Sequence, residues 1–409
     1  MAPFPNWAPH ILCAIVGISA WIEINGIFSE LGLMKGLPEG KSIASIIVII
    51  VQIGNVVPLL FSLLPRKPRL RWSMVLVLAL GISSLVFLAI LWDRTFFIFG
   101  SERSVMLYVG TFIAAGADCL SNIVFWPYVG QFPRSYITAM GVGESLSSAV
   151  SAITTTTQKA IGFSPSVFFV VLTAIVLICS SAFAYLESRY FSALTEEAQL
   201  KSVSESAVLP ATSMDVLNES SDADSIQQQQ PPWRAEIPTL AVIAGVAFVQ
   251  NALNPSLLPY ACKGYSNAHW ISQNALFVAS PIMSLSASFF KPRKSIVPAV
   301  CIWIATSVFI TVAAALPTPV LTDQAAGTGL MAAVSILSGS ALAYTKVSAM
   351  LMLRSKQMPA AYGRQVGLGN KEYMQKLMTS AGISMQVGSV TGAVLMFTLV
   401  QIAKVFPSK

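Results

Sequence analysis

Three polar residues stand inside an apolar stretch near the start of the chain. Glu23, Asn25 and Glu30 fall within residues 9–33, a stretch long enough for a membrane-spanning helix, which takes about 20 residues. An ionisable side chain at that depth costs at least about 2.5–3.5 kcal/mol on insertion scales, so such residues usually face a protein interior or an aqueous cavity. The first helix therefore predicts a polar pathway through a membrane.

Polar side chains recur at helical spacing on other apolar segments. Two runs place four residues at i, i+3, i+4 and i+7, which forms one stripe of a helix: Asp118, Ser121, Asn122 and Phe125, and then Glu144, Ser147, Ser148 and Ser151. For a single Ser, Asn or Gln, the simpler interpretation is a hydrogen bond between membrane helices, worth about 0.6 kcal/mol. Four carboxylates face one intramembrane cation, Lys346, so pairing cannot neutralise them all, and a functional role is predicted for some.

The composition indicates which kind of element positions these residues. Of 409 residues, 55% are hydrophobic and only 11% charged, whereas soluble domains have about 25% charged residues. We therefore predict an all-α polytopic membrane protein. Its eleven apolar runs lie near residues 9–31, 43–64, 72–92, 105–129, 135–158, 165–187, 237–259, 269–290, 295–316, 325–353 and 378–403.

The longest polar connection divides these segments into six and five. Residues 188–236 are rich in Ser, Gln and acidic residues, a composition typical of disorder. We predict an N-terminal six-helix bundle at 1–187, a disordered acidic cytoplasmic linker at 188–236 and a C-terminal five-helix bundle at 237–409. Basic residues cluster at 66–71, 291–294 and 354–376, and the positive-inside rule then places the N-terminus in the cytoplasm and the C-terminus outside.

Several classes of function find no support. The +7 net charge is explained by topology, so no nucleic-acid partner is expected. Five scattered cysteines and two histidines show no metal-ligand spacing, so neither a metal site nor a cofactor is expected. Because no nucleophile–base pair or HExxH motif appears, an enzyme is not expected either.

Three stretches resemble a known family. They are WIEINGIFSELGLMKGLPEG at 21–40, VQIGNVVPLL at 51–60 and AGADCLSNIVFWPYVGQFPRSYITAMGVGESLS at 115–147. They are similar to the eukaryotic riboflavin transporter family of solute carriers, whose patterns are close to W-V-x-I-N-G-x-W-V-E-L-P-L, I-Q-L-A-N-I-G-P-L-L and D-C-T-S-S-V-T-F-L-P-F. AYTKV at 343–347 and QVGS at 386–389 extend the likeness to nearly all of the chain outside 188–236.

This resemblance implies a fold and a set of positions. The fold is eleven helices in a 6+5 arrangement, like the major-facilitator and equilibrative nucleoside transporters. The positions that match the family patterns are Asn25, Glu30, Glu39, Gln52, Asn55, Asp118, Glu144, Lys346 and Gln386. Phe28 replaces the family's Trp, Gly32 its Pro, and Leu120-Ser121-Asn122 its Thr-Ser-Ser, so these departures affect the expected substrate specificity.

The function expected from residues and resemblance is cellular uptake of riboflavin by alternating access at the plasma membrane. Riboflavin is uncharged near neutrality, so amides and hydroxyls can bind its ribityl chain and aromatic faces its ring. The predicted substrate-binding residues are Asn25, Phe28, Glu30, Gln52, Asn55, Asp118, Asn122, Phe125, Asn254, Tyr344 and Gln386. Glu39, Glu144 and Lys346 are predicted to act in gating or coupling.

Alternatives remain open at the level of sequence. The same polar faces suit a carrier for nucleosides or another polar heterocycle. A non-transporting membrane receptor is the alternative of another class, although the predicted outer loops are short. The sequence leaves proton coupling and oligomeric state open.

Overall fold

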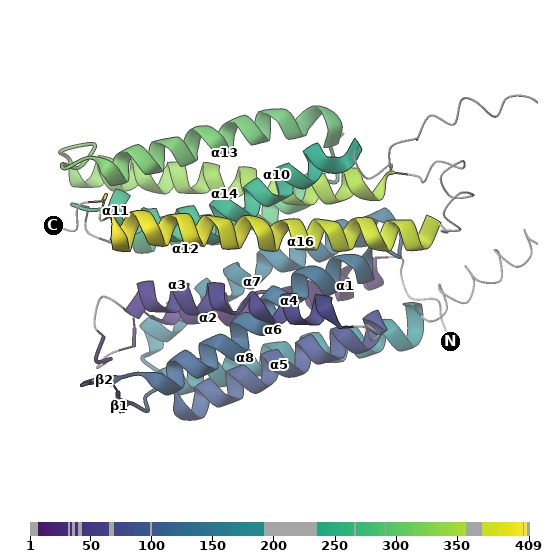
Figure 1. Ribbon diagram of the computed structural model, residues 1–409, viewed down its shortest axis with the longest axis horizontal. Coiled ribbons are helices and arrows are strands. Elements are labelled where there is room, and N and C mark those ends of the chain that lie inside the picture. The colour runs from purple at the N-terminus through teal and green to yellow at the C-terminus, as the bar shows by residue number, and fades with distance from the viewer. Residues whose placement is uncertain are drawn as a thin grey trace, which may run out of the picture.

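The computed structural model describes residues 7–31, 33–34, 37–39, 43–64, 69–98, 100–191, 235–265, 267–290, 292–356, 370–403 and 405–406. Its helices lie side by side along the long axis of the molecule (Figure 1). Those of the first part of the chain are α1 (Ala8–Ile18), α2 (Ile22–Glu30), α3 (Ile43–Ile53), α4 (Val56–Leu63), α5 (Leu70–Leu91), α6 (Val105–Val129), α7 (Arg134–Ile161) and α8 (Pro165–Leu186), followed by the π-helical turn η2 (Glu187–Phe191).

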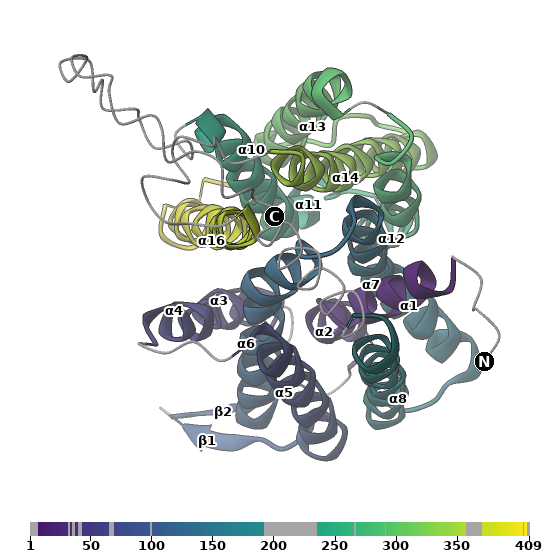
Figure 2. The ribbon, with the colours of Figure 1, turned by 90° about the vertical axis from the view of Figure 1, so that its right-hand side faces the viewer.

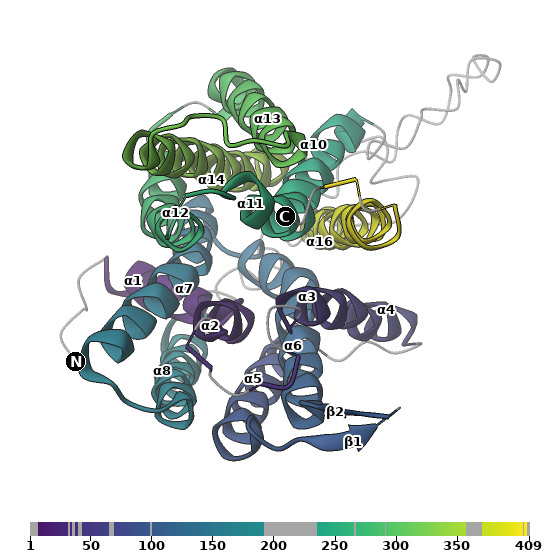
Figure 3. The same cartoon turned by 90° about the vertical axis from the view of Figure 1, so that its left-hand side faces the viewer.

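The second part of the chain forms another set. Its elements are α10 (Ile237–Phe248), the π-helical turn η4 (Val249–Leu253), α11 (Asn254–Ala261), α12 (Ala268–Ser286), α13 (Pro292–Ala315), α14 (Gln324–Arg354), α16 (Asn370–Phe397) and the π-helical turn η5 (Thr398–Ile402). Seen along the long axis, α1–α8 lie on one side and α10–α16 on the other, with α7 and α12 adjoining between them (Figures 2 and 3).

The predicted helical membrane fold is confirmed. Each of the eleven apolar runs corresponds to a helix or to an interrupted pair of helices. In the described part of the chain, eight helices are long and apolar enough to span a membrane, and α1 with α2, bent by 51°, would make a ninth. The count of eleven spans therefore stays a prediction. One element was not predicted: an antiparallel hairpin of β1 (Phe96–Ile98) and β2 (Ser101–Arg103), which turns at Gly100 with φ of +77°.

Most of the predicted linker, residues 192–234, lies outside the described residues. Its edges differ from the prediction, because η2 continues α8 as far as Phe191, and Glu236 is the residue directly before α10. The division into two bundles and a linker stays a proposal.

The first predicted span is broken where it packs most closely. A Cβ at Gly143 of α7 would lie 2.0 Å from the Ala14 carbonyl oxygen, and one at Gly17 would lie 2.6 Å from the Met140 carbonyl oxygen. Only glycine permits this approach. Directly after it α1 ends: the Ser19 hydroxyl donates to the Val16 carbonyl at 2.7 Å, and Trp21 leaves helical geometry with φ of −144°. The break turns α2 toward α6.

The apolar core is continuous across the two helix sets at one end only. The largest cluster joins Trp126, Phe132 and Met140 of the first set to Met350 and Met378 of the second. Two smaller clusters contain residues of the second set alone, among them Tyr265, Ile310, Met331 and Met396. The sets are therefore sealed together by apolar packing toward the end of α14 and the start of α16.

Candidate functional site

A cavity of about 1040 Å³ lies between the two helix sets. Its wall comes from α2, α3, α6 and α7 on one side and from η4, α11, α12, α13, α14, α16 and η5 on the other. The wall reaches Leu31 after α2, Tyr260 on α11, Trp270 at the start of α12 and Phe397 at the end of α16. The cavity therefore extends toward the end of the molecule opposite the sealed one, and its volume is at the upper end of the ~300–1,000 Å³ usual for ligand pockets.

Close backbone packing and hydrogen bonds to backbone carbonyls join the two helix sets at the sealed end. A Cβ at Gly382 of α16 would lie 2.5 Å from the Asn122 carbonyl oxygen of α6, so these two helices touch at their backbones. The Arg354 guanidinium donates to the Phe132 carbonyl at 3.2 Å. The Gln386 amide donates to the Cys119 carbonyl. These contacts join the two helix sets between the cavity and the sealed end.

Amide side chains from both sets line the cavity. Gln52 of α3 donates to the Asn251 carbonyl of η4 at 3.3 Å, and the Asn251 amide donates to Ser389 of α16 at 2.8 Å. Asn254 donates to Ser338 at 3.2 Å, but its Oδ1 atom has no partner, as is also true of Asn55 Oδ1. These amide side chains border the cavity, while the two oxygens without a partner are themselves buried.

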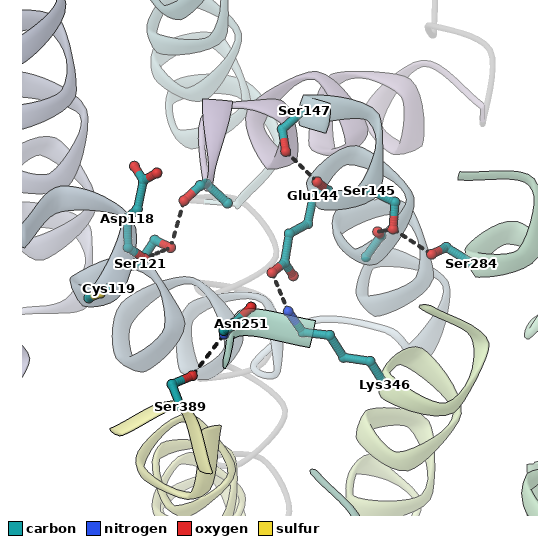
Figure 4. Close-up of polar contacts among 12 residues, drawn as sticks. Asp118, Cys119, Ser121, Glu144, Ser145, Ser147, Asn251, Ser284, Lys346 and Ser389 are labelled. Atoms are coloured by element: carbon teal, nitrogen blue, oxygen red, sulfur yellow. Dashed lines mark hydrogen bonds and ion pairs between the residues drawn. The ribbon is translucent and has the colours of Figure 1, made fainter. Parts of the chain in front are cut away.

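The charges on the wall neutralise each other. Among the described lining residues, the acidic one is Glu144 of α7 and the one Lys or Arg residue is Lys346 of α14, and they form an ion pair across the two sets (Figure 4). Their side chains are only 11% and 13% exposed, respectively. Lys346 also lies 5.9 Å from the Trp126 ring centroid, which is a cation–π distance. A cavity of this kind suits a polar solute without net charge.

Eight of the predicted residues lie on this wall. They are Asn25, Phe28, Gln52, Asn55, Glu144, Asn254, Lys346 and Gln386. They come from six parts of the chain that are distant in the sequence: α2, the end of α3 with the residue before α4, α7, the start of α11, α14 and α16. Their contact with substrate stays a prediction.

The other predicted substrate-binding residues are buried behind the wall in this conformation. Glu30 is fully buried and accepts a hydrogen bond of 2.7 Å from Gln158 of α7. Phe125 lies in the apolar core, and the Tyr344 hydroxyl is bonded to Ser295. Asn122 borders a separate small void beside Met385. Asp118 is buried against α2, with its carboxyl accepting from the Ile24 amide at 3.0 Å.

Glu39, predicted to act in gating, anchors a loop. Its carboxylate accepts from the Ser104 amide at 2.8 Å, from the Ser104 hydroxyl at 2.8 Å and from the Tyr108 hydroxyl. Burial alone would raise the pKa of this carboxyl, but these hydrogen bonds outweigh it and lower the pKa below its ordinary value of 4.5. Ser104 precedes α6, so Glu39 ties the loop after α2 to the start of that helix.

Replacing this carboxylate by an amide is expected to destabilise the protein. Glu39→Gln removes charge-assisted hydrogen bonds, which are worth about 1.5–3 kcal/mol. Because the folded pKa is the lower one, the stabilisation is complete above the unfolded pKa and is lost as the pH falls through the folded pKa. Thermal unfolding of the purified chain, measured at neutral pH and below pH 4.5, should show a difference from wild type that shrinks on acidification. The exposed change Asp93→Asn is the control, and a difference independent of pH would contradict the assignment.

Some lining residues were not predicted. Gln273 and Asn274 of α12 line the cavity beside Trp270. Two adjacent amides inside an apolar run are the sequence signal that indicates them. Ser335 of α14 also lines the cavity and has an unpartnered hydroxyl. In the part of the chain that the structure describes, no group of three His, Cys, Asp or Glu residues is placed to hold a metal.

Comparison with known proteins identifies the family. The family model "Solute carrier family 52, riboflavin transporter" matches residues 6–408. The chain belongs to solute carrier family 52. It is therefore a multi-pass membrane carrier and not an enzyme.

Curated relatives match along nearly their whole length. The zebrafish (Danio rerio) protein "Solute carrier family 52, riboflavin transporter, member 3-A" is 27% identical over 98% of this chain and 97% of its own. Human member 3 is 26% identical with the same coverage. The Caenorhabditis elegans protein "Riboflavin transporter rft-1" is 27% identical over 97% of each chain.

Solved structures support the fold of this family member. The Major Facilitator Superfamily transporter FucP, in the outward conformation, aligns with a TM-score of 0.54 over 96% of this chain and 91% of its own. The sequences are 14% identical, so the likeness concerns the fold. The predicted major-facilitator architecture is confirmed.

Proposed function

We propose that this chain carries riboflavin across a membrane by alternating access. The cavity carries the proposal: it lies between the two helix sets, is sealed at one end and has a polar, aromatic and electrically neutral wall. The curated relatives are named as riboflavin transporters, which supports this substrate. No cofactor is required, because moving a solute across a membrane breaks no bond.

The chemistry of the wall matches the parts of riboflavin. Its ribityl hydroxyls need donors and acceptors, which Asn25, Asn55, Asn254 and Ser335 provide. Its flat tricyclic ring needs aromatic faces, and Trp21, Phe28, Tyr260 and Trp270 lie along the same wall. Riboflavin needs no counter-ion near neutral pH, and the wall charges are already paired.

We also propose that the open end of the cavity faces outward at the plasma membrane. The basic residues Arg71 at the start of α5, Lys294 at the start of α13 and Lys356 after α14 lie near the sealed end, whereas Phe397 and Val400 extend the cavity toward the opposite end. The positive-inside rule places the basic end in the cytoplasm. This orientation supports a cytoplasmic N-terminus and an extracellular C-terminus.

The first test is uptake of radiolabelled riboflavin by cells that express the chain at a measured surface level. Asn25→Ala and Asn254→Ala each remove hydrogen-bonding groups on the wall, worth about 0.5–1.5 kcal/mol per bond. We expect the KM to rise about 3–10-fold for each variant. Gln375→Ala, a half-buried amide on α16 outside the wall, is the matched control and should leave the KM unchanged.

Competition distinguishes the substrate classes. Lumiflavin, which keeps the ring and lacks the ribityl chain, should inhibit uptake, whereas uridine and adenosine should not. Saturable uptake blocked by uridine but not by lumiflavin would favour a nucleoside carrier. Absence of any riboflavin uptake by well-folded surface protein would contradict the proposal.

A further inference from the structure

Two carboxyl groups lie against each other inside the first helix set. Glu23 of α2 and Asp118 of α6 are each 1% exposed, and their side chains are within hydrogen-bonding contact. Neither belongs to the cavity wall. One oxygen of each group, Glu23 Oε2 and Asp118 Oδ1, has no protein donor. Two carboxyl groups in contact can form a hydrogen bond with each other only if one of them carries a proton.

No charged partner neutralises the pair among the described residues. Of the helices packed on α2 and α6, α8 contributes the thiol of Cys179, and Cys119 lies next to Asp118. The helix α5 contributes Gly81, where a Cβ would lie 2.2 Å from Glu23 Oε1. Among the described side chains, the other charged residues on these helices are Glu30, which accepts from Gln158, and Glu144, which is paired with Lys346. Arg71 and Lys159 lie near helix ends, and Glu372 and Lys376 lie in the first turns of α16. The helices α3 and α4 contain no charged residue.

Electrostatics then fixes how many protons the pair holds. Two carboxylates in contact and out of water cannot both be ionised, because their repulsion adds to the cost of burying each charge. A single proton converts the repulsion into a hydrogen bond between a carboxylic acid and a carboxylate. The other oxygen of Asp118 has a hydrogen-bond donor of its own, because the Ile24 amide donates to Asp118 Oδ2 at 3.0 Å.

The pair lies directly behind the cavity wall at the break of the first span. Ile24 and Asn25, which follow Glu23, line the cavity, as does Cys119, which follows Asp118. The Ser121 hydroxyl donates to the Ala20 carbonyl at 3.1 Å (Figure 4). The pair therefore fastens the start of α2 to α6 within one residue of the cavity.

We propose that Glu23 and Asp118 form a proton-binding site that holds one proton, and that solute movement through the cavity is coupled to this proton. With the proton in place, the hydrogen bond holds α2 against α6. When the proton passes to water in the cavity, two negative charges remain in contact and drive α2 and α6 apart. The coupling rests on the proposed carrier function, whereas the proton site does not.

Infrared spectroscopy of the purified full-length chain tests the proton site without any transport assay. At neutral pH the wild type should show a carboxylic acid C=O stretching band. Part of that band should be lost in Glu23→Gln and in Asp118→Asn. Glu102→Gln, in the hairpin, is the matched control and should keep the whole band. A wild-type spectrum without a component that depends on Glu23 would overturn the site.

Transport in proteoliposomes tests the coupling. Wild-type uptake of riboflavin should increase as the outside is acidified, with alkalinisation of the external buffer during uptake. Any uptake that remains in Glu23→Gln should show neither effect, because the glutamine amide is a permanent donor to Asp118 that preserves the fold and releases no proton. An unchanged pH profile in Glu23→Gln would overturn the coupling. If the purified chain shows the infrared band but its proteoliposomes take up no riboflavin, the proposed substrate and the proposed coupling are both wrong. The proton site is then still supported.

Discussion

Lys346→Met is expected to abolish uptake and to lower the yield of folded protein. The change leaves Glu144 charged and nearly buried between α7 and α14 without its partner. Removing one member of a buried ion pair costs about 3–5 kcal/mol, because the remaining charge stays desolvated. This is a large fraction of the stability of a typical protein. Uptake and monodisperse yield in detergent, measured on the same preparations, check the prediction.

A double variant that also changes Glu144 makes this prediction specific. Glu144→Gln combined with Lys346→Met removes both charges, so the double variant should recover most of the folded yield that the single variant loses. Lys376→Met is the control, because it breaks an exposed pair with Glu372, and exposed pairs are worth about 0–1 kcal/mol. A double variant as unstable as Lys346→Met would contradict a role for the unpaired charge. Loss of uptake in a well-folded double variant would assign the pair a further role in transport.

Gly382→Val is expected to abolish uptake without loss of folded protein. A Cβ at this position meets the Asn122 carbonyl of α6 at 2.5 Å, so a valine forces apart two helices that belong to different sets. The contact closes the sealed end, and the other packing of α16, against α10, remains. The variant should therefore favour a conformation in which that end is open, and in alternating access a carrier held in one state does not turn over. Uptake together with thiol labelling of a cavity position, such as Ser148→Cys, measures this shift.

Two other glycines provide the comparison. A Cβ at Gly388, also on α16, would lie 2.0 Å from the Ala244 carbonyl of α10, inside a single helix set. Gly388→Val should therefore reduce the folded yield itself. Gly329 of α14 has open space around it, so Gly329→Val should change little. Equal losses of folded yield in Gly382→Val and Gly388→Val would contradict the prediction that the Gly382 contact serves to close the sealed end and the Gly388 contact serves folding.

The sequence by itself determined the helical membrane fold and the family. A bilayer cannot satisfy exposed backbone groups, so apolar runs of about 20 residues must become helices, wherever they pack. The motifs around Asn25, Gln52 and Asp118 carried the family resemblance. Gly388 and Gly392 have the spacing of a small-residue packing motif, and both lie against α10 and η4. These features depend on local composition, which a single chain displays directly.

Only the tertiary structure decided which polar residues face the cavity. A membrane helix has several faces, and the neighbours of each face come from distant parts of the chain. Asn25 and Glu30 share one helix, but Asn25 reaches the cavity whereas Glu30 meets Gln158 of α7. The Asp118 side chain contacts Glu23 and Ile24 rather than the cavity. Of the four acidic residues in the apolar segments, Glu144 is the one that forms an ion pair with Lys346. Helical spacing fixes the direction of a side chain relative to its own axis, but the packing of helices decides whether that direction leads to water, to another charge or to the core.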